Sequence, residues 1–138
     1  QPSGIHSFDL SEPTAPVSVG LHEAGRVPAR NVTIHGTRAY VVYQRTSLIE
    51  IVDITSPSTP NLLGHYKTTG QPEMVAADGT SIVIPKSGDG IEVVNLVDPT
   101  APAVTTTYDT PGTARDIAIH GNYLLVADSQ SLEVLRWR

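Results

Sequence analysis

The chain has 138 residues, which is enough for one domain, and its net charge of −5 argues against nucleic acid as a partner. It contains no cysteine, which excludes disulfides, cysteine-ligated zinc and thiol catalysis. No apolar run approaches the ~18 residues that a membrane span needs. The 40 β-branched residues outnumber 11 alanines, and this balance favours strands.

The first expected elements are two strands in residues 1–28, which we interpret as a partial repeat. An alternating run over residues 5–10 leads into a Pro-x-x-Pro turn at residues 13–16, and a second strand follows. Prolines fit this turn because no ladder N–H is needed there. The chain does not begin with methionine and residues 1–4 do not resemble a signal peptide, so we expect a removed leader or an excerpt of a longer protein.

Residues 29–70 form the first complete repeat of the prediction. Its four strands, named a to d, are expected at about residues 31–34, 39–44, 48–54 and 61–67. Gly36 joins a to b, because a tight hairpin needs a residue with positive φ. Strand a is short and nearly continuously apolar, which predicts cover on both faces. Strand d is more polar, which predicts an exposed outer edge.

The same turns recur in residues 71–112, a complete repeat, and in residues 113–138, a last repeat with strands a to c only. The hairpin glycines are spaced by 43 and 42 residues, at Gly36, Gly79 and Gly121. The Pro-x-x-Pro turns are spaced by 44 and 42, at residues 13–16, 57–60 and 99–102. Four strands every ~42 residues are typical of a β-propeller blade. A β-sandwich is the alternative, but it has no reason to keep a fixed period. The predicted fold is all-β, a β-propeller of four-stranded antiparallel blades with about three blades per chain.

The predicted strands number thirteen, one more than three closed blades contain, because a copy of strand c lies near each end. Propellers usually have four to eight blades, so three are too few for a ring. The chain is then half of a six-bladed ring completed by a second copy, a part of a longer propeller, or an open arc. We expect the homodimer, because unpaired strand edges invite pairing and a cyclic assembly satisfies them. We also expect one copy of strand c to fray or to exchange between chains.

The start of strand a carries the best candidates for function. Counting six and five residues back from each hairpin glycine gives three pairs: Arg30 with Asn31, Glu73 with Met74, and Arg115 with Asp116. In a propeller these pairs converge at the mouth of the central channel. Arg30, Asn31, Glu73, Arg115 and Asp116 then form a candidate site for a small polar or anionic ligand or a protein, since arginine offers a planar fork of donors. The alternative is that these groups pair with one another and with the backbone between blades.

Other patterns carry less chemistry. The turn Ser87-Gly88-Asp89-Gly90 falls short of a calcium loop, which needs six to eight oxygens. The five histidines lack metal-binding spacing and are expected to be solvated. We therefore assign no metal, no cofactor and no catalytic residue. Glu73 and Asp116 are the carboxylates that a propeller hydrolase or lyase would use.

The strand-c motif Ile49-Glu50-Ile51-Val52-Asp53-Ile54 resembles the LVIVD-repeat family, as does the turn after it. The resemblance continues over residues 108–119 and 121–128 and extends over essentially the whole chain, with residues 71–74 departing most. It implies a β-propeller and an exported location: secreted, periplasmic or at the cell surface. It does not imply an activity, because the family is defined by a structural repeat. The expected function is a non-enzymatic module for protein or ligand binding. A propeller enzyme and a structural segment of a surface protein are the alternatives.

Overall fold

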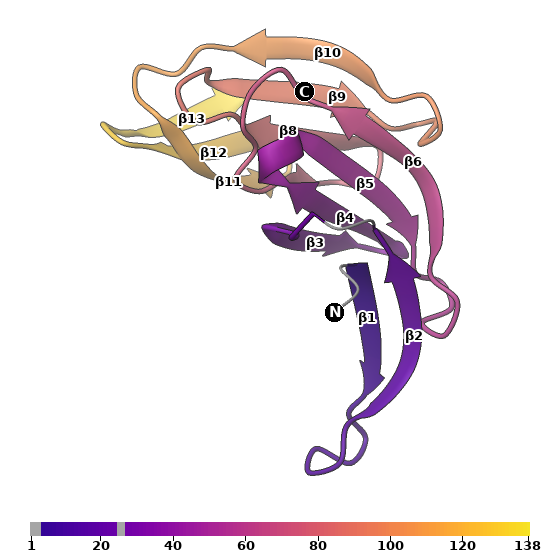
Figure 1. Ribbon diagram of the computed structural model, residues 1–138. Helices are drawn as coiled ribbons and strands as arrows, with labels where there is room; N and C mark the ends of the chain where they lie inside the picture. The colour runs from indigo at the N-terminus through magenta and orange to yellow at the C-terminus, as the bar shows by residue number, and fades with distance from the viewer. Residues whose placement is uncertain (1–3, 25–26) are drawn as a thin grey trace.

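The computed structural model describes residues 4–24 and 27–138, so the predictions for residues 1–3 and 25–26 lie outside it. The described residues form four antiparallel sheets that follow one another along an arc (Figure 1). The sheet orders are β1-β2, β3-β4-β5-β6, β7-β8-β9-β10 and β11-β12-β13. The strands are β1 (Gly4–Asp9), β2 (Val17–Glu23), β3 (Asn31–His35), β4 (Arg38–Tyr43), β5 (Leu48–Asp53), β6 (Asn61–Lys67), β7 (Ala76–Ala77), β8 (Ser81–Pro85), β9 (Ile91–Asn95), β10 (Ala103–Tyr108), β11 (Ala114–His120), β12 (Tyr123–Asp128) and β13 (Leu132–Arg136).

The all-β antiparallel prediction is confirmed, but the described residues do not close into a ring. The only helical turn among them is a short 3₁₀ segment at Gln44–Thr46. No helix in this part of the chain is long and apolar enough to span a bilayer.

The turns that reveal the period in the sequence have the expected local chemistry. Gly36, Gly79 and Gly121 have φ values of 57°, 94° and 56°, which L-residues with a Cβ rarely adopt. The turn after β5 begins where Asp53 Oδ1 accepts the Thr55 N–H at 2.8 Å. Hydrogen bonds from the Thr55 hydroxyl and N–H lower the pKa of this carboxyl. Each repeat therefore specifies its own hairpins locally.

Neighbouring sheets pack face to face, and their apolar side chains form the core. The core between the second and third sheets contains only fully buried side chains: Tyr40, Val42, Ile49, Ile51, Val75, Ile82, Ile84, Val94 and Leu96. A second core joins the third and fourth sheets: Ala76, Val83, Ile91, Val93, Ala114, Ile117, Leu124 and Val126. Consecutive residues of one strand therefore point to opposite faces of the sheet and pack against different neighbouring sheets.

The inner edge of the arc is formed by strands a, and the outer edge by strands d (Figure 1). Strand β3 contacts β7, and β7 contacts β11. The Thr33 hydroxyl donates to the Val75 carbonyl at 2.7 Å, which joins the second sheet to the third. All six residues of β10 are exposed, so the predicted polar outer strand is confirmed there.

Strands β2 and β6 each lie close to the c–d turn of the next sheet. A Cβ on Gly20 would lie 2.1 Å from the Pro57 carbonyl oxygen, and one on Gly64 would lie 2.1 Å from that of Pro99. Glycine is therefore required at both positions. The corresponding residue of β10 is Thr106, since Gly20, Gly64 and Thr106 pair with the same position of strand c.

The prediction that strand a is covered on both faces is wrong for β3, and also for β11, where Ala118 is exposed. Val32 and Ile34 are 55% and 62% exposed. Their counterparts in the next two sheets include Val75 and Ile117, which are 0% and 4% exposed. The difference arises because the first sheet consists of strands c and d only and has no inner strands to cover β3.

Candidate functional site

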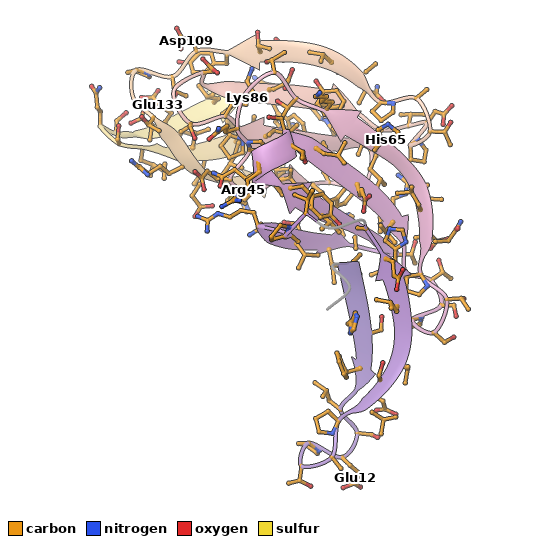
Figure 2. The ribbon with its side chains drawn as sticks, in the orientation of Figure 1. Glu12, Arg45, His65, Lys86, Asp109 and Glu133 are labelled. Carbon is orange, nitrogen blue, oxygen red and sulfur yellow. The ribbon has the colours of Figure 1, made fainter. Side chains whose placement is uncertain are left out.

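The d–a and b–c loops lie on one side of the arc. Arg45, Lys86 and Asp109 gather on this side in Figure 2, whereas Glu12, in a c–d turn, lies far from them. Backbone hydrogen bonds connect loops of neighbouring sheets, among them Ala114 N–H to Ser87 O at 3.1 Å. Polar loops from consecutive sheets therefore form one continuous surface.

Arg30 and Glu73 meet on this surface. Arg30 Nη2 donates to Glu73 Oε2 at 3.1 Å, and Gln44 Nε2 donates to Glu73 Oε1 at 2.9 Å. The Arg30 side chain is 58% exposed, so solvent screens the ion pair. Two of the predicted residues are thus joined across neighbouring sheets. The partner Gln44 was not among the predicted residues; it begins the 3₁₀ turn between β4 and β5.

Among the described residues, no side-chain hydrogen bond or ion pair joins the other predicted residues to this pair. Asn31 Oδ1 accepts a hydrogen bond of 3.4 Å from the Thr33 hydroxyl. Asp116 Oδ1 accepts the Ile117 N–H at 2.8 Å. Arg115 is exposed and, within the described ranges, forms no ion pair.

The b–c loops bind the neighbouring d–a loops. Lys86, only 6% exposed, donates through Nζ to the Thr69 hydroxyl at 3.1 Å. Asp128 Oδ1 accepts the Gln130 N–H at 2.7 Å, and Oδ2 accepts the Gly112 N–H at 3.0 Å. These backbone hydrogen bonds, with those from Ser131, lower the pKa of Asp128. Within residues 4–24 and 27–138, no three His, Asp or Glu side chains cluster as a metal site would require.

The expectation of solvated histidines is wrong for His22. Its side chain is 13% exposed, and Nε2 lies 3.3 Å from Glu50 Oε2. The Tyr43 hydroxyl donates to the same oxygen at 3.1 Å, and burial followed by the nearby Glu50 charge raises the pKa of Tyr43. His22 stands on strand d at the place that Tyr66 holds one sheet later. It therefore connects the first sheet to the second.

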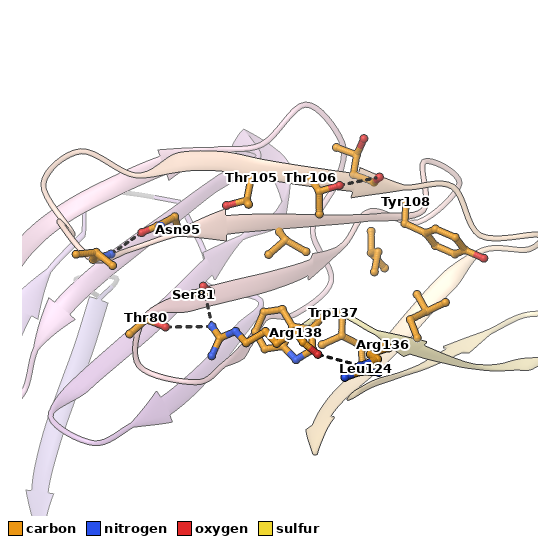
Figure 3. Close-up of a pocket in the computed structure, with 15 residues that line it drawn as sticks. Thr80, Ser81, Asn95, Thr105, Thr106, Tyr108, Leu124, Arg136, Trp137 and Arg138 are labelled. Atoms are coloured by element: carbon orange, nitrogen blue, oxygen red, sulfur yellow. Dashed lines mark hydrogen bonds between the residues drawn. The ribbon is translucent and has the colours of Figure 1, made fainter. Parts of the chain in front are cut away.

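A groove of about 630 Å³ separates the third sheet from the fourth (Figure 3). Thr105, Thr106 and Tyr108 of β10 line one side. The other side is the end of the chain, where the Arg138 guanidinium lies 4.2 Å from the centre of the Trp137 ring and pairs with Asp78. This groove was not predicted from the sequence. The one feature of the sequence that could have indicated the groove is Thr106, because the two earlier repeats have glycine at this position.

Two segments of the chain match the family model of the LVIVD repeat, residues 28–68 and 111–135. The chain therefore contains LVIVD repeats. The first matched segment contains β3 to β6, and the second contains β11, β12 and most of β13. No curated protein matches the chain.

The LVIVD match is narrower than the predicted resemblance, because residues 69–110 lie outside both segments. Residues 71–74 depart from the other repeats, and strand β7 after them has only two residues, Ala76–Ala77. The third sheet nevertheless has the same strand order as the second. The middle repeat therefore keeps the four-stranded order, although the sequence before its strand a differs and the strand itself is shorter.

Proposed function

We propose that this LVIVD-repeat chain is a non-enzymatic binding module of the β-propeller type. Its ligand is a small molecule with a carboxylate or phosphate group, bound where β3, β7 and β11 begin. One observation supports this most. Arg30, Glu73 and Arg115 hold equivalent positions in consecutive sheets, and Arg30 and Gln44 hold Glu73 while Arg115 is exposed without an ion pair among the described residues.

An exposed guanidinium offers two parallel N–H donors, which match the two oxygens of a carboxylate or phosphate. The loops that present it are bound to one another by backbone hydrogen bonds such as Ala114 N–H to Ser87 O at 3.1 Å. Binding residues on loops held by a rigid scaffold are common in proteins. The arrangement therefore favours recognition of an anion by a preformed surface.

A hydrolase or lyase that uses Glu73 and Asp116 is the alternative function. Both Glu73 oxygens already accept hydrogen bonds, from Arg30 and Gln44. Such a carboxylate is better suited to holding Arg30 in place than to exchanging a proton with substrate. If turnover of any substrate is found, loss of that turnover in a folded Glu73→Ala, Asp116→Ala double variant would favour the enzyme.

Calorimetric titration with acetate, succinate, citrate and inorganic phosphate tests the binding proposal. We expect at least one probe to bind the wild-type chain, and Arg115→Gln to weaken that binding at least ten-fold. Arg45→Gln is the matched control, because Arg45 is an exposed arginine on the same face in a b–c loop. Equal losses in the two variants would refute the assigned site. Absence of binding by every probe would favour a structural segment of a surface protein.

The proposal also includes the setting of the module. We propose that it works outside the cytoplasm, as a secreted, periplasmic or cell-surface protein, and the family resemblance is the support for this setting. Its ring is completed by a second copy or by further blades, because propellers usually have at least four blades.

A further inference from the structure

The last sheet of the arc leaves one apolar face uncovered. Leu132 and Val134 of β13 are 63% and 59% exposed. In the second sheet the same register positions hold Ile49 and Ile51, which are fully buried. The uncovered face is therefore the one that each inner sheet turns toward its successor.

The first sheet leaves a complementary gap. Its two strands correspond to c and d, so no strand a or b lies over the inner part of β3–β6. Val32 and Ile34 are exposed as a result, and a shallow pocket lies between Val32 and the free edge of β1. Strands a and b, which this end lacks, are the strands that β11 and β12 provide at the other end.

We propose that a second copy of this chain fills both gaps, so that the last sheet of one copy becomes the first sheet of the other. The contact between the two copies repeats the packing that neighbouring sheets of one chain already form. Leu132 and Val134 of one copy would face Val32 of the other, as Ile49 and Ile51 face Val75. This match is the reason for choosing a second copy as the occupant. The inference rests on the proposed propeller module, and two head-to-tail joints close a ring of six sheets.

The two copies of strand c compete for one place in the joint sheet. Strand β13 is held within its own copy, where Leu135 and Trp137 pack on the core and the Trp137 N–H donates to Asn122 O at 3.0 Å. Strand β2 is also held, by Gly20 against Pro57 and by His22 beside Glu50. Strand β1 pairs with β2 alone among the described strands, and Ile5 is its one side chain that packs on the core of the second sheet. In the joint sheet β1 therefore leaves, and β2 pairs with the free edge of β13.

Thr106 supports this exchange. If β1 stayed in place, the Pro13–Pro16 turn of the second copy would approach Thr106 as Pro99 approaches Gly64, where a Cβ lies 2.1 Å from the carbonyl oxygen. The Thr106 side chain excludes a turn of that form. The groove between β10 and β13 leaves room for the segment to take another course once β1 has left.

Engineered disulfides test the arrangement without interference, because the chain has no cysteine. In the second sheet Glu50 pairs with His65, so the same register pairs Glu133 of one copy with Leu21 of the other. We expect the wild-type chain to have twice the mass of 14.7 kDa by light scattering and native mass spectrometry. We expect Leu21→Cys, Glu133→Cys to form an interchain disulfide under mild oxidation. Circular dichroism of the reduced variant checks that it folds.

A second pair of cysteines distinguishes the competing strand. Ser7→Cys, Leu125→Cys reports the arrangement in which β1 stays and β13 leaves. In that arrangement Leu125 of one copy and Ser7 of the other occupy the positions that Tyr40 and Ile51 hold in the second sheet, where they pair. Cross-linking of this pair instead of the first, or of neither pair, would overturn the proposed joint. A wild-type monomer at all concentrations would also overturn it.

A charge substitution gives an independent measurement. Val134→Lys should weaken the dimer at least ten-fold, and Val104→Lys is the control, since Val104 is 49% exposed on the outer strand β10. Equal dissociation constants for both variants would contradict the interface. Failure of anion binding would leave these masses and cross-links unchanged, so the two proposals fail separately.

Discussion

Substitution of Gly64 by alanine should destabilise the protein at one defined contact. The new Cβ would lie 2.1 Å from the Pro99 carbonyl oxygen and 3.2 Å from Thr100 Cα, and both are backbone atoms. Real Cβ contacts are essentially never shorter than 3.0 Å, so β6 and the following turn must separate by about 1 Å or more. Overpacking of this kind costs about 1–3 kcal/mol. The lower entropy of the unfolded alanine chain offsets about 0.4–1 kcal/mol of this cost.

Urea unfolding followed by circular dichroism measures the effect. The centres of these two ranges give a net loss of about 1.3 kcal/mol, which lowers the midpoint by about 0.6 M at a slope of about 2 kcal/mol per molar urea. Gly88→Ala is the matched control, since a Cβ there meets nothing within 4 Å and φ is not positive. Gly88→Ala should leave the midpoint unchanged or raise it. If Gly64→Ala unfolds at the same urea concentration as Gly88→Ala, the close approach of strand d to the next turn is refuted.

Three further predictions concern single groups. Thr68→Val removes the hydroxyl that donates to Glu92 Oε2 at 2.7 Å; because Glu92 is only 3% exposed, urea unfolding should show a loss of about 1.5–3 kcal/mol. The Asp128 pKa is lowered in the folded chain, so its stabilisation is complete above the unfolded pKa near 4 and is lost as pH falls through the folded value. Asp128→Asn should therefore unfold at lower urea than wild type at pH 6, with the difference shrinking toward pH 2.5. At Gly121 φ is 56° and a Cβ would meet nothing within 4 Å, so only the left-handed backbone opposes substitution. Gly121→Ala should cost about 1–2 kcal/mol of stability, and Gly121→Asn less, because asparagine adopts this conformation more readily. Equal melting temperatures of the two variants would contradict this conformational explanation.

The strands and hairpins could be predicted from the sequence because their signals are local. A glycine with positive φ or a proline pair fixes a turn within a few residues, whatever lies beside the sheet. Exposure of Val32 could not be predicted in this way. Val32 and Val75 are the same residue type at equivalent positions. They differ in exposure only because the first sheet has no inner strands to cover Val32.

The candidate site was predictable in part for the same reason. Equal distances from the hairpin glycines place Arg30 and Glu73 at the same point of neighbouring sheets, and the structure joins them at 3.1 Å. Gln44 as the second partner depends on the twist between sheets, which no local pattern encodes. The burial of His22 depends on Glu50, a residue 28 positions later on another sheet. The groove beside Thr106 depends on how the third and fourth sheets lie relative to each other, so a single repeat cannot reveal it.

The magnitudes show why the proposed joint needs backbone pairing. Val32, Ile34, Leu132 and Val134 are each about 60% exposed, and complete burial of such side chains yields about 1.5–3 kcal/mol apiece. Burying these four contributes roughly 4–7 kcal/mol, whereas association costs about 4–15 kcal/mol in lost freedom. The apolar contacts alone therefore do not give a stable dimer. The hydrogen bonds between β2 and β13 are needed to replace those that β2 loses when β1 leaves, and the rest of the buried face must supply the remainder. Proline at Leu21, which removes one of the N–H groups of β2, should consequently weaken the dimer as much as a charge at Val134 does.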